Sequence, residues 1–343
     1  GKNATIVTAM ADRDLAIKNV LHSAFSHAGQ KCSATSLLLL EAEIYDDAEF
    51  KRTFIEAARS LIVGSAWELP TKIGPLIRPP TGDLANALLT LEEGESWALM
   101  PCKLEGNDGL WSPGIKWGVQ PGSYTHMTEF FGPVLGVMRF EKLHEAIALV
   151  NQTGYGLTSG LESLDDREQA EWKAGIRAGN LYINRGTTGA IVLRQPFGGM
   201  GKSAFGPGLK AGGPNYVAQF MRFVETPARP GDQPLNNPAL ERLALNIVNE
   251  SCGVPEEKYW RTLKAMESCD QWWNAEFGRE HDYFRLIGQD NVRRYLPMRV
   301  VHVRVSREDS FFEIFTRVAA ARVTGARTIV SSPHGLDTYE LRL

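Results

Sequence analysis

Residues 134–184 read VLGVMRFEKLHEAIALVNQTGYGLTSGLESLDDREQAEWKAGIRAGNLYIN and alternate short apolar runs with longer amphipathic stretches. The apolar runs predict strands over residues 134–140, 156–161 and 181–184. The stretches between them predict helices over residues 143–151 and 165–178. Strands and helices that alternate at these lengths favour an α/β fold, in which flanking helices cover a largely parallel sheet.

The same kind of alternation precedes this region. Apolar residues at helical spacing predict helices over residues 17–25 and 50–61, with Asp12 or Asp14 as a cap of the first, and the apolar run 36–40 between them predicts a buried strand. A further helix is expected over residues 83–92, and only short strands over residues 94–128. The glycine-dense segment 186–213 contains too many helix and strand breakers for regular structure, and residues 216–224 predict a closing strand.

Residues 226–238, TPARPGDQPLNNP, are typical of a linker. Helices are expected beyond it, over residues 239–250 and 256–277, followed by a strand, a helix and a strand over residues 299–305, 311–324 and 328–330. The expected organisation is therefore a larger α/β domain over residues 1–225, a linker over residues 226–238, and a smaller α/β domain over residues 239–343.

Size and charge narrow the class of protein. The chain has 343 residues, of which 43% are hydrophobic, which is enough for two domains with cores of their own. The formal net charge is -3, and no block of Lys or Arg stands out. A chain with this charge lacks the basic surface that is typical of nucleic-acid-binding proteins, which argues against that class. The expected partner is therefore a small molecule.

The four cysteines are widely spaced and form no C-x-x-C pair, which argues against a zinc site or a disulfide framework: Cys32, Cys102, Cys252 and Cys269. We expect no bound metal and a reducing compartment. No apolar run approaches the roughly 20 residues needed to span a bilayer, and the start of the chain lacks the pattern of a signal peptide. A cytoplasmic location is therefore expected.

Cys32 is the candidate nucleophile. It lies in the stretch FSHAGQKCSA, residues 25–34, just past the predicted helix that Gly29 breaks. A cysteine in a loop that directly follows a rigid helix can be held in place, partly exposed and close to backbone N–H groups. The alternative is a buried structural cysteine. His22 and His27 also permit a Cys–His hydrolase or acyltransferase, although no third, orienting residue is evident.

Three segments occur in the order and approximate spacing that the aldehyde dehydrogenase superfamily shows: GQKCSA at 29–34, EFFGP at 129–133 and QPFGG at 195–199. Residues 180–217 resemble the branch that oxidises glutamate γ-semialdehyde, the open form of Δ1-pyrroline-5-carboxylate, and most of all the dehydrogenase half of bifunctional proline utilization A proteins. The resemblance covers about residues 1–225. Residues 275–335 are more faintly similar to the extra C-terminal domain of the long members, which has a cofactor-domain-like fold and a structural role.

The resemblance implies roles for the residues that would contact the reacting aldehyde carbon and the cofactor. Cys32 would attack the aldehyde carbon, its own backbone N–H would help to hold the oxyanion, and NAD would accept the hydride. The ribose hydroxyls of the cofactor would donate hydrogen bonds to Glu129, and Phe131 would pack beside the nicotinamide.

The resemblance also implies how the substrate is bound. The Ser33 hydroxyl and the backbone N–H groups of Gly189 and Ala190 would hold the substrate carboxylate. Phe197 would form an apolar wall beside the aliphatic part of the substrate. No residue is expected to bind a metal.

The opening Gly1-Lys2-Asn3 resembles the end of the superfamily's Glu-x-Gly-Gly-Lys segment, so the glutamate that activates the hydrolytic water is expected upstream of residue 1. The same holds for the NAD-binding domain, the oxyanion-hole asparagine and any FAD-binding proline dehydrogenase domain. The chain is therefore expected to be a C-terminal fragment of a homo-oligomeric enzyme and to be inactive alone. Alternatives are a dehydrogenase for a different aldehyde and an assembly module that acts through residues 186–224 and the second domain.

Overall fold

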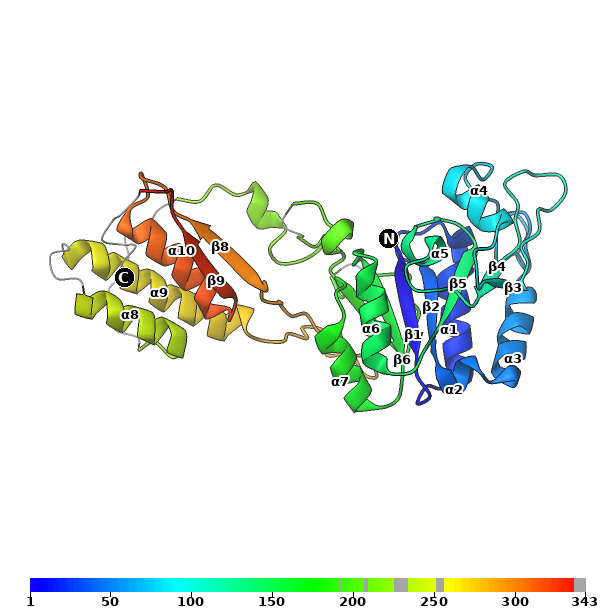
Figure 1. Cartoon of the computed structure of the whole chain (residues 1–343), viewed down its shortest axis with the longest axis horizontal. Coiled ribbons are helices and arrows are strands. Elements are labelled where there is room, and N and C mark those ends of the chain that lie inside the picture. Colours follow the sequence, from blue (N-terminus) through cyan, green and yellow to red (C-terminus); the bar gives the residue numbers. More distant parts are fainter. Residues whose placement is uncertain (192, 207–208, 225–233, 251–255, 336–343) are drawn as a thin grey trace. The chain divides into compact units, whose positions relative to one another are not determined.

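The computed structural model describes residues 1–191, 193–206, 209–224, 234–250 and 256–335. It divides into two compact units, Gly1–Phe220 and Met221–Leu343, which are described separately. Figure 1 shows the course of the chain through both.

A seven-stranded sheet forms the centre of the first unit, with the strand order β3-β4-β5-β2-β1-β6-β7. All neighbouring strands run parallel except the edge strand β3, which is antiparallel to β4. The strands are β1 (Asn3–Val7), β2 (Thr35–Glu41), β3 (Ser96–Leu99), β4 (Gly114–Trp117), β5 (Val134–Phe140), β6 (Thr158–Glu162) and β7 (Asn180–Ile183). The predicted α/β fold with a largely parallel sheet is confirmed.

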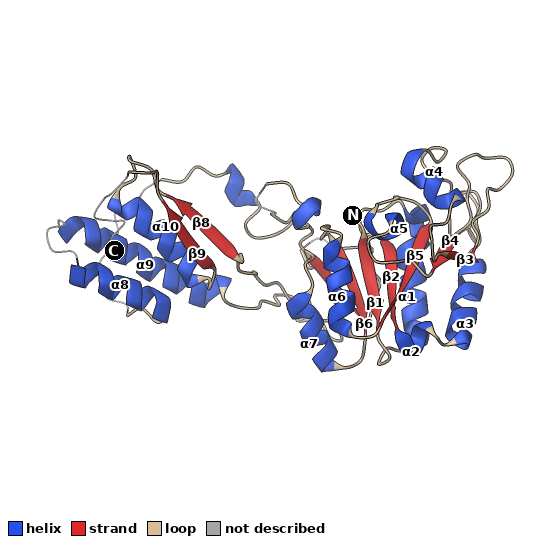
Figure 2. Ribbon diagram, viewed as in Figure 1, coloured by secondary structure: helices blue, strands red, loops and turns tan. Residues whose placement is uncertain are grey.

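Helices cover both faces of this sheet (Figure 2). Alternate residues of β2 point to opposite faces, so Leu38 and Leu40 enter one core and Leu37 and Leu39 enter the other. The first core contains residues of α1 (Arg13–Phe25), α3 (Ala48–Arg59) and α4 (Gly82–Leu89), and the second contains residues of α6 (Leu143–Gln152) and α7 (Asp166–Gly175). Two further helices, α2 (Ala42–Tyr45) and α5 (Tyr124–Met127), are a single turn long.

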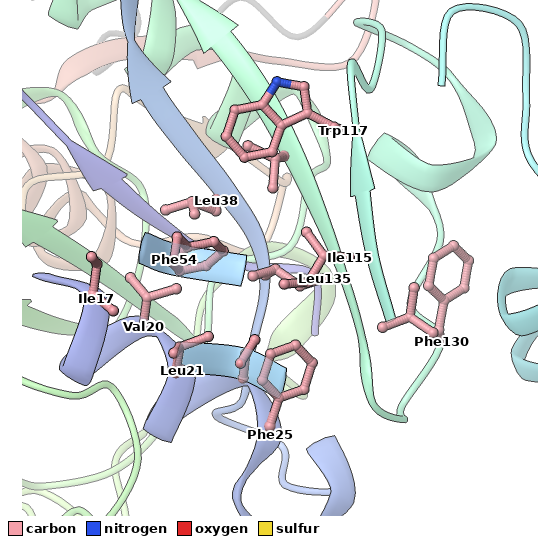
Figure 3. Packing of buried hydrophobic residues seen from close by; sticks show 14 of the residues in the cluster. Ile17, Val20, Leu21, Phe25, Leu38, Phe54, Ile115, Trp117, Phe130 and Leu135 are labelled. Carbon is pink, nitrogen blue, oxygen red and sulfur yellow. The ribbon is translucent and has the colours of Figure 1, made fainter. Parts of the chain in front are cut away.

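Helix α1 follows from its sequence. The Asp12 side chain accepts a hydrogen bond of 3.0 Å from the backbone N–H of Leu15, which caps the helix as expected. The apolar face of α1 packs against the sheet with Ile17, Val20 and Phe25 buried (Figure 3). Complete burial of each such side chain contributes roughly 1.5–3 kcal/mol. This packing fixes the end of the helix that leads into the Cys32 loop.

The predicted strand over residues 216–224 is wrong. Val217–Phe220 form a short 3-10 helix instead. Phe220, Phe223 and Val224 are each more than three-quarters exposed. The apolar alternation therefore buries no face, and within the described residues no strand pairs with this segment. Between residues 186 and 213, the described residues form one 3-10 turn, Gly201–Ser203, and an isolated bridge between Phe197 and Ala211, in agreement with the prediction of irregular structure.

The second unit contains the predicted strand, helix and strand: β8 (Val300–Arg304), α10 (Phe311–Val323) and β9 (Arg327–Ser331). The two strands pair in parallel. Leu240 of α8 (Pro238–Glu250) and Met266 of α9 (Glu256–Trp272) are buried in one core with residues of α10. Most of the predicted linker, residues 225–233, lies outside the described residues. In the part of the chain that is described, no helix is long and apolar enough to cross a membrane.

Glu162 is a buried acid at the end of β6. The Asn19 side chain donates hydrogen bonds of 3.1 and 3.2 Å to its two carboxyl oxygens. Burial outweighs this and raises the pKa of Glu162 to about 8, with a smaller contribution in the same direction from Asp12. The folded chain therefore holds this proton more tightly than the unfolded chain does.

This proton makes stability depend on pH. The contribution of protonated Glu162 is complete below the ordinary pKa of 4.5 and is lost as pH rises to about 8. We predict that Glu162→Gln becomes more stable relative to the unmutated chain across that window, by roughly 4–5 kcal/mol, because a change of one pKa unit corresponds to about 1.4 kcal/mol. Urea unfolding at both ends of the window measures this change. Glu171→Gln, at an exposed position of α7, serves as the control. A difference that stays constant with pH would contradict the assignment.

Candidate active site

The three sequence segments meet at one end of the sheet, the end at which its parallel strands begin. The segment with Cys32 leads into β2, and the segment with Glu129 leads into β5. The segment with Phe197 is fastened to the first residue of β7, because the Asn180 side chain donates a hydrogen bond of 3.0 Å to the Pro196 carbonyl. Since β2, β5 and β7 run parallel, their amino ends share this end of the sheet.

The backbone before Cys32 makes a left-handed turn. Helix α1 ends at Phe25, and His27, Ala28 and Gly29 then adopt φ values of 57°, 54° and 67°. Non-glycine residues rarely adopt this conformation, which costs of order 1–3 kcal/mol each and is concentrated at functional sites. The turn leaves Cys32 exposed while Ser33 is 6% exposed. A thiol at this position is open to a substrate.

Three consecutive backbone carbonyls around Cys32 are held by side chains. The Asn3 side-chain amide donates hydrogen bonds of 2.8 Å to the Cys32 carbonyl and 2.9 Å to the Ala34 carbonyl. The Thr187 hydroxyl donates a hydrogen bond of 3.0 Å to the Ser33 carbonyl between them. The loop is therefore fixed on both sides. Neither Asn3 nor Thr187 was among the predicted site residues, because only the fold brings them to Cys32.

Thr187 ends a chain of buried hydroxyl groups. Its oxygen lies 3.1 Å from that of Thr35, which lies 3.0 Å from that of Thr5. Each hydroxyl has one proton, and Thr187 donates its own to the Ser33 carbonyl. Thr35 must then donate to Thr187, and Thr5 to Thr35. This chain of hydrogen bonds has a single direction and ends on the Cys32 loop.

The segment with Glu129 contacts the Cys32 loop directly. The Gln30 side chain donates a hydrogen bond of 3.2 Å to the Phe131 carbonyl. A Cβ atom on Gly29 would clash with the Gly132 carbonyl, so the two segments approach closely only because Gly29 has no side chain. Phe131 has a φ of 56° and a ring that is 41% exposed. Its exposed ring is available to pack beside a planar group.

Glu129 lies among charged groups. Its side chain is 30% exposed, and one carboxylate oxygen pairs with the amino group of Gly1. Burial, and then the nearby Lys116, lowers the pKa of Lys2 to about 7, while Glu129 opposes this shift. The Lys2 amine lies 4.1 Å from the centre of the Phe130 ring. Glu129 therefore lies beside the buried Lys2 amine and keeps part of its side chain exposed.

The segment with Phe197 forms a closed loop. Phe197 and Ala211 exchange two backbone hydrogen bonds, of 3.0 and 2.9 Å. The Lys210 amine donates hydrogen bonds to the carbonyls of Gly179 and Gly198. Burial lowers the pKa of Lys210 to about 8. The loop that carries Phe197 is therefore anchored to the residues that lead into β7.

Gly189 and Ala190 follow directly after the Thr187 anchor. Gly189 is exposed, has a φ of 86°, and has nothing within 4 Å of the place where a Cβ atom would lie. Its backbone is therefore open to a ligand, as the predicted carboxylate contact requires. Ala190 is half-buried. The segment lies next to the Cys32 loop because Thr187 binds the Ser33 carbonyl.

The rival Cys–His site receives no support. Within the described residues, neither His22 nor His27 forms a hydrogen bond with Cys32, and both rings are exposed. Burial, followed by Lys31 and His22, lowers the pKa of His27. The described residues also contain no group of three or more His, Cys, Asp or Glu side chains arranged to hold a metal ion.

The contact between Gly29 and Gly132 can be tested by substitution. We predict that Gly29→Ala loses roughly 1–2 kcal/mol to the left-handed backbone and roughly 1–3 kcal/mol more to the clash with Gly132. Gly122→Ala is the matched control, because Gly122 has a φ of 79° but open space around it. Denaturant unfolding of both variants measures the difference. Equal losses in the free energy of unfolding would show that the close approach of Gly29 to Gly132 contributes nothing to stability.

Comparison with known proteins identifies the family of the first unit. Residues 1–225 match the aldehyde dehydrogenase family. The 1-pyrroline-5-carboxylate dehydrogenase of Bacillus cytotoxicus is 35% identical over 236 residues, which is 66% of this chain and 43% of that protein. The enzyme of the same name from Bacillus subtilis is 33% identical over 229 residues, again 66% of this chain and 43% of that protein. The chain thus spans less than half the length of these relatives.

Solved structures extend the similarity to the second unit. Proline utilization A from Corynebacterium freiburgense is 43% identical, has a TM-score of 0.83, and matches 98% of this chain and 33% of its own. The 1-pyrroline-5-carboxylate dehydrogenase from Thermus, solved with bound NAD, is 35% identical, with a TM-score of 0.57 over 64% of this chain and 42% of its own. With its motif segments gathered at one end of the sheet and two-thirds of its length matched, the chain belongs to the aldehyde dehydrogenase family.

Proposed function

We propose that this chain is the cysteine-bearing part of an enzyme that oxidises glutamate γ-semialdehyde to glutamate with NAD⁺. The observation that carries the proposal is the exposed Cys32, held by its backbone between the segments of Glu129 and of Gly189 and Ala190. The relatives named 1-pyrroline-5-carboxylate dehydrogenase support this substrate, which is the open form of that ring.

The reaction begins at the Cys32 sulfur. The thiolate attacks the aldehyde carbon and forms a hemithioacetal, whose oxyanion accepts a hydrogen bond from the Cys32 backbone N–H. Loss of hydride from that carbon leaves a thioester on Cys32. Water then cleaves the thioester, which releases the carboxylic acid and restores the thiol. NAD⁺, when bound, supplies the hydride acceptor for this sequence.

The residues at this end of the sheet fit their proposed partners. Glu129 keeps 30% of its side chain exposed for the ribose hydroxyls, and the exposed Phe131 ring is available to the nicotinamide. The open backbone at Gly189 and the neighbouring Ala190 N–H suit a carboxylate, together with the Ser33 hydroxyl. Phe197 forms the apolar wall on the anchored loop.

The proposal assigns the remaining parts of the reaction to a longer protein. The water-activating glutamate, the NAD-binding domain and an FAD-binding proline dehydrogenase domain lie outside this chain. The longer protein is a cytoplasmic homo-oligomer, and residues 239–343 are a structural domain in it. The similarity to a proline utilization A structure over 98% of this chain supports this organisation.

Two alternatives have support of their own. A different aldehyde would require only a changed binding site for its distal end, since the roles proposed for Cys32 and Glu129 involve only the reacting carbon and the cofactor. An assembly module is favoured by the exposed aromatic rings of Phe205 and Phe220, which are 101% and 78% exposed. In that case residues 186–224 would contact another copy of the protein.

The proposal predicts no more than a trace of NADH formation by the purified 343-residue chain with glutamate γ-semialdehyde and NAD⁺, measured by absorbance. The longer protein should form NADH rapidly, and Cys32→Ala in it should abolish the activity, whereas Cys102→Ala should not. An active Cys32→Ala protein would overturn the role of Cys32. Turnover by the isolated chain would show that it needs no other domain.

A further inference from the structure

Tyr182 lies on the same face of the sheet as the hydroxyl chain that ends at the Cys32 loop. Its neighbour in register is Gly160 of β6, whose own neighbour is Thr5 of β1. A Cβ atom on Gly160 would lie 2.9 Å from the Thr5 hydroxyl and 3.0 Å from a methyl carbon of Thr187. Residues paired in register point to the same face of a sheet, so the Tyr182 side chain shares this face with Thr5 and Thr187.

The Tyr182 hydroxyl is buried but unpaired. The residue is 3% exposed, and its hydroxyl has no hydrogen-bond partner within the described part of the chain. A buried polar group without a partner costs roughly 1–3 kcal/mol, which calls for an explanation. Burial raises the pKa of Tyr182, Arg185 opposes this shift, and Cys32 adds to it. Tyr182 shares its face of the sheet with Thr187, whose hydroxyl binds the carbonyl of Ser33, the residue next to Cys32.

Arg185 brings a positive charge to the same place. Its guanidinium carbon lies 5.5 Å from the centre of the Tyr182 ring, and the residue is half-buried. Among the described residues, no carboxylate forms an ion pair with it. A phenol without an acceptor and a guanidinium without a counter-ion thus lie side by side near the candidate nucleophile.

We propose that Tyr182 and Arg185 form an anion-binding element beside Cys32, which holds an acidic group of the molecule that the thiol attacks. The phenol donates a hydrogen bond to the anion, and the guanidinium supplies the charge. This inference rests on the proposed role of Cys32 as a nucleophile. It adds two residues to the predicted carboxylate contacts of Ser33, Gly189 and Ala190, and it favours electrophiles that carry a carboxylate over neutral ones.

Alkylation of the purified chain tests the proposal without any cofactor. Iodoacetate and iodoacetamide are similar in size, but only iodoacetate is anionic. The rates with both reagents are measured at Cys32 by peptide mass spectrometry, with the exposed Cys102 as the internal standard. We expect Tyr182→Phe and Arg185→Met each to lower the iodoacetate-to-iodoacetamide rate ratio at Cys32 by roughly three- to tenfold. The ratio at Cys102 should not change.

Matched variants separate binding from structure. Arg185→Lys should retain part of the preference for iodoacetate, because it keeps the charge. Tyr155→Phe should have no effect, although the Lys202 amine lies 5.4 Å from the Tyr155 ring in a similar cation–aromatic pair. Thermal unfolding of each variant verifies that it is folded.

Two results would overturn the proposal in distinguishable ways. An unchanged rate ratio in both Tyr182→Phe and Arg185→Met would refute the anion-binding element and leave the nucleophile in place. A Cys32 that reacts with neither reagent in the folded chain would refute its role as an accessible nucleophile, and the anion-binding element with it.

Discussion

The hydrogen bonds from the Asn3 side chain to the carbonyls of Cys32 and Ala34 are the interaction on which the site depends. Asn3 is the first residue of β1, an interior strand of the sheet, so these bonds connect the loop to a strand that is paired on both sides. Thr187 holds the carbonyl between them from a segment that follows β7. Together they fix the backbone of Cys32 while its side chain stays exposed.

Close contacts between glycine backbones bring the other two segments to this loop. Gly29 meets Gly132 on the side of Glu129, and Gly179 meets Gly198 on the side of Phe197. A side chain at Gly29 or Gly179 would separate the segments. Glycine therefore acts here through the absence of a side chain, which lets three separate stretches of sequence share one end of the sheet.

The sequence predicted the parts of the fold that depend on local pattern. Helix α1 could be predicted because its buried residues recur at helical spacing and Asp12 precedes them. The strand over residues 216–224 was predicted wrongly, because an apolar alternation does not reveal whether a partner strand exists. The short helix α5 was missed within residues 94–128, since a single turn has no periodicity to detect.

The candidate site was predictable in a similar way. Cys32, Glu129 and Phe197 stand in recognisable segments, whereas Asn3, Thr187 and Tyr182 gain their significance only from strand order. Parallel strands far apart in the sequence place their amino ends together, and no spacing within the sequence records which strands are neighbours. The contacts that hold the backbone of Cys32 therefore had to be read from the structure.

The central claim is that this chain presents Cys32 to an aldehyde that carries a carboxylate. Protection of Cys32 from iodoacetamide by glutarate semialdehyde, compared with pentanal of the same carbon number, tests it most directly. The account predicts that glutarate semialdehyde slows the modification of Cys32 at concentrations where pentanal has little effect, and that Cys102 reacts at the same rate throughout. Equal protection by the two aldehydes, or none at Cys32, would contradict it.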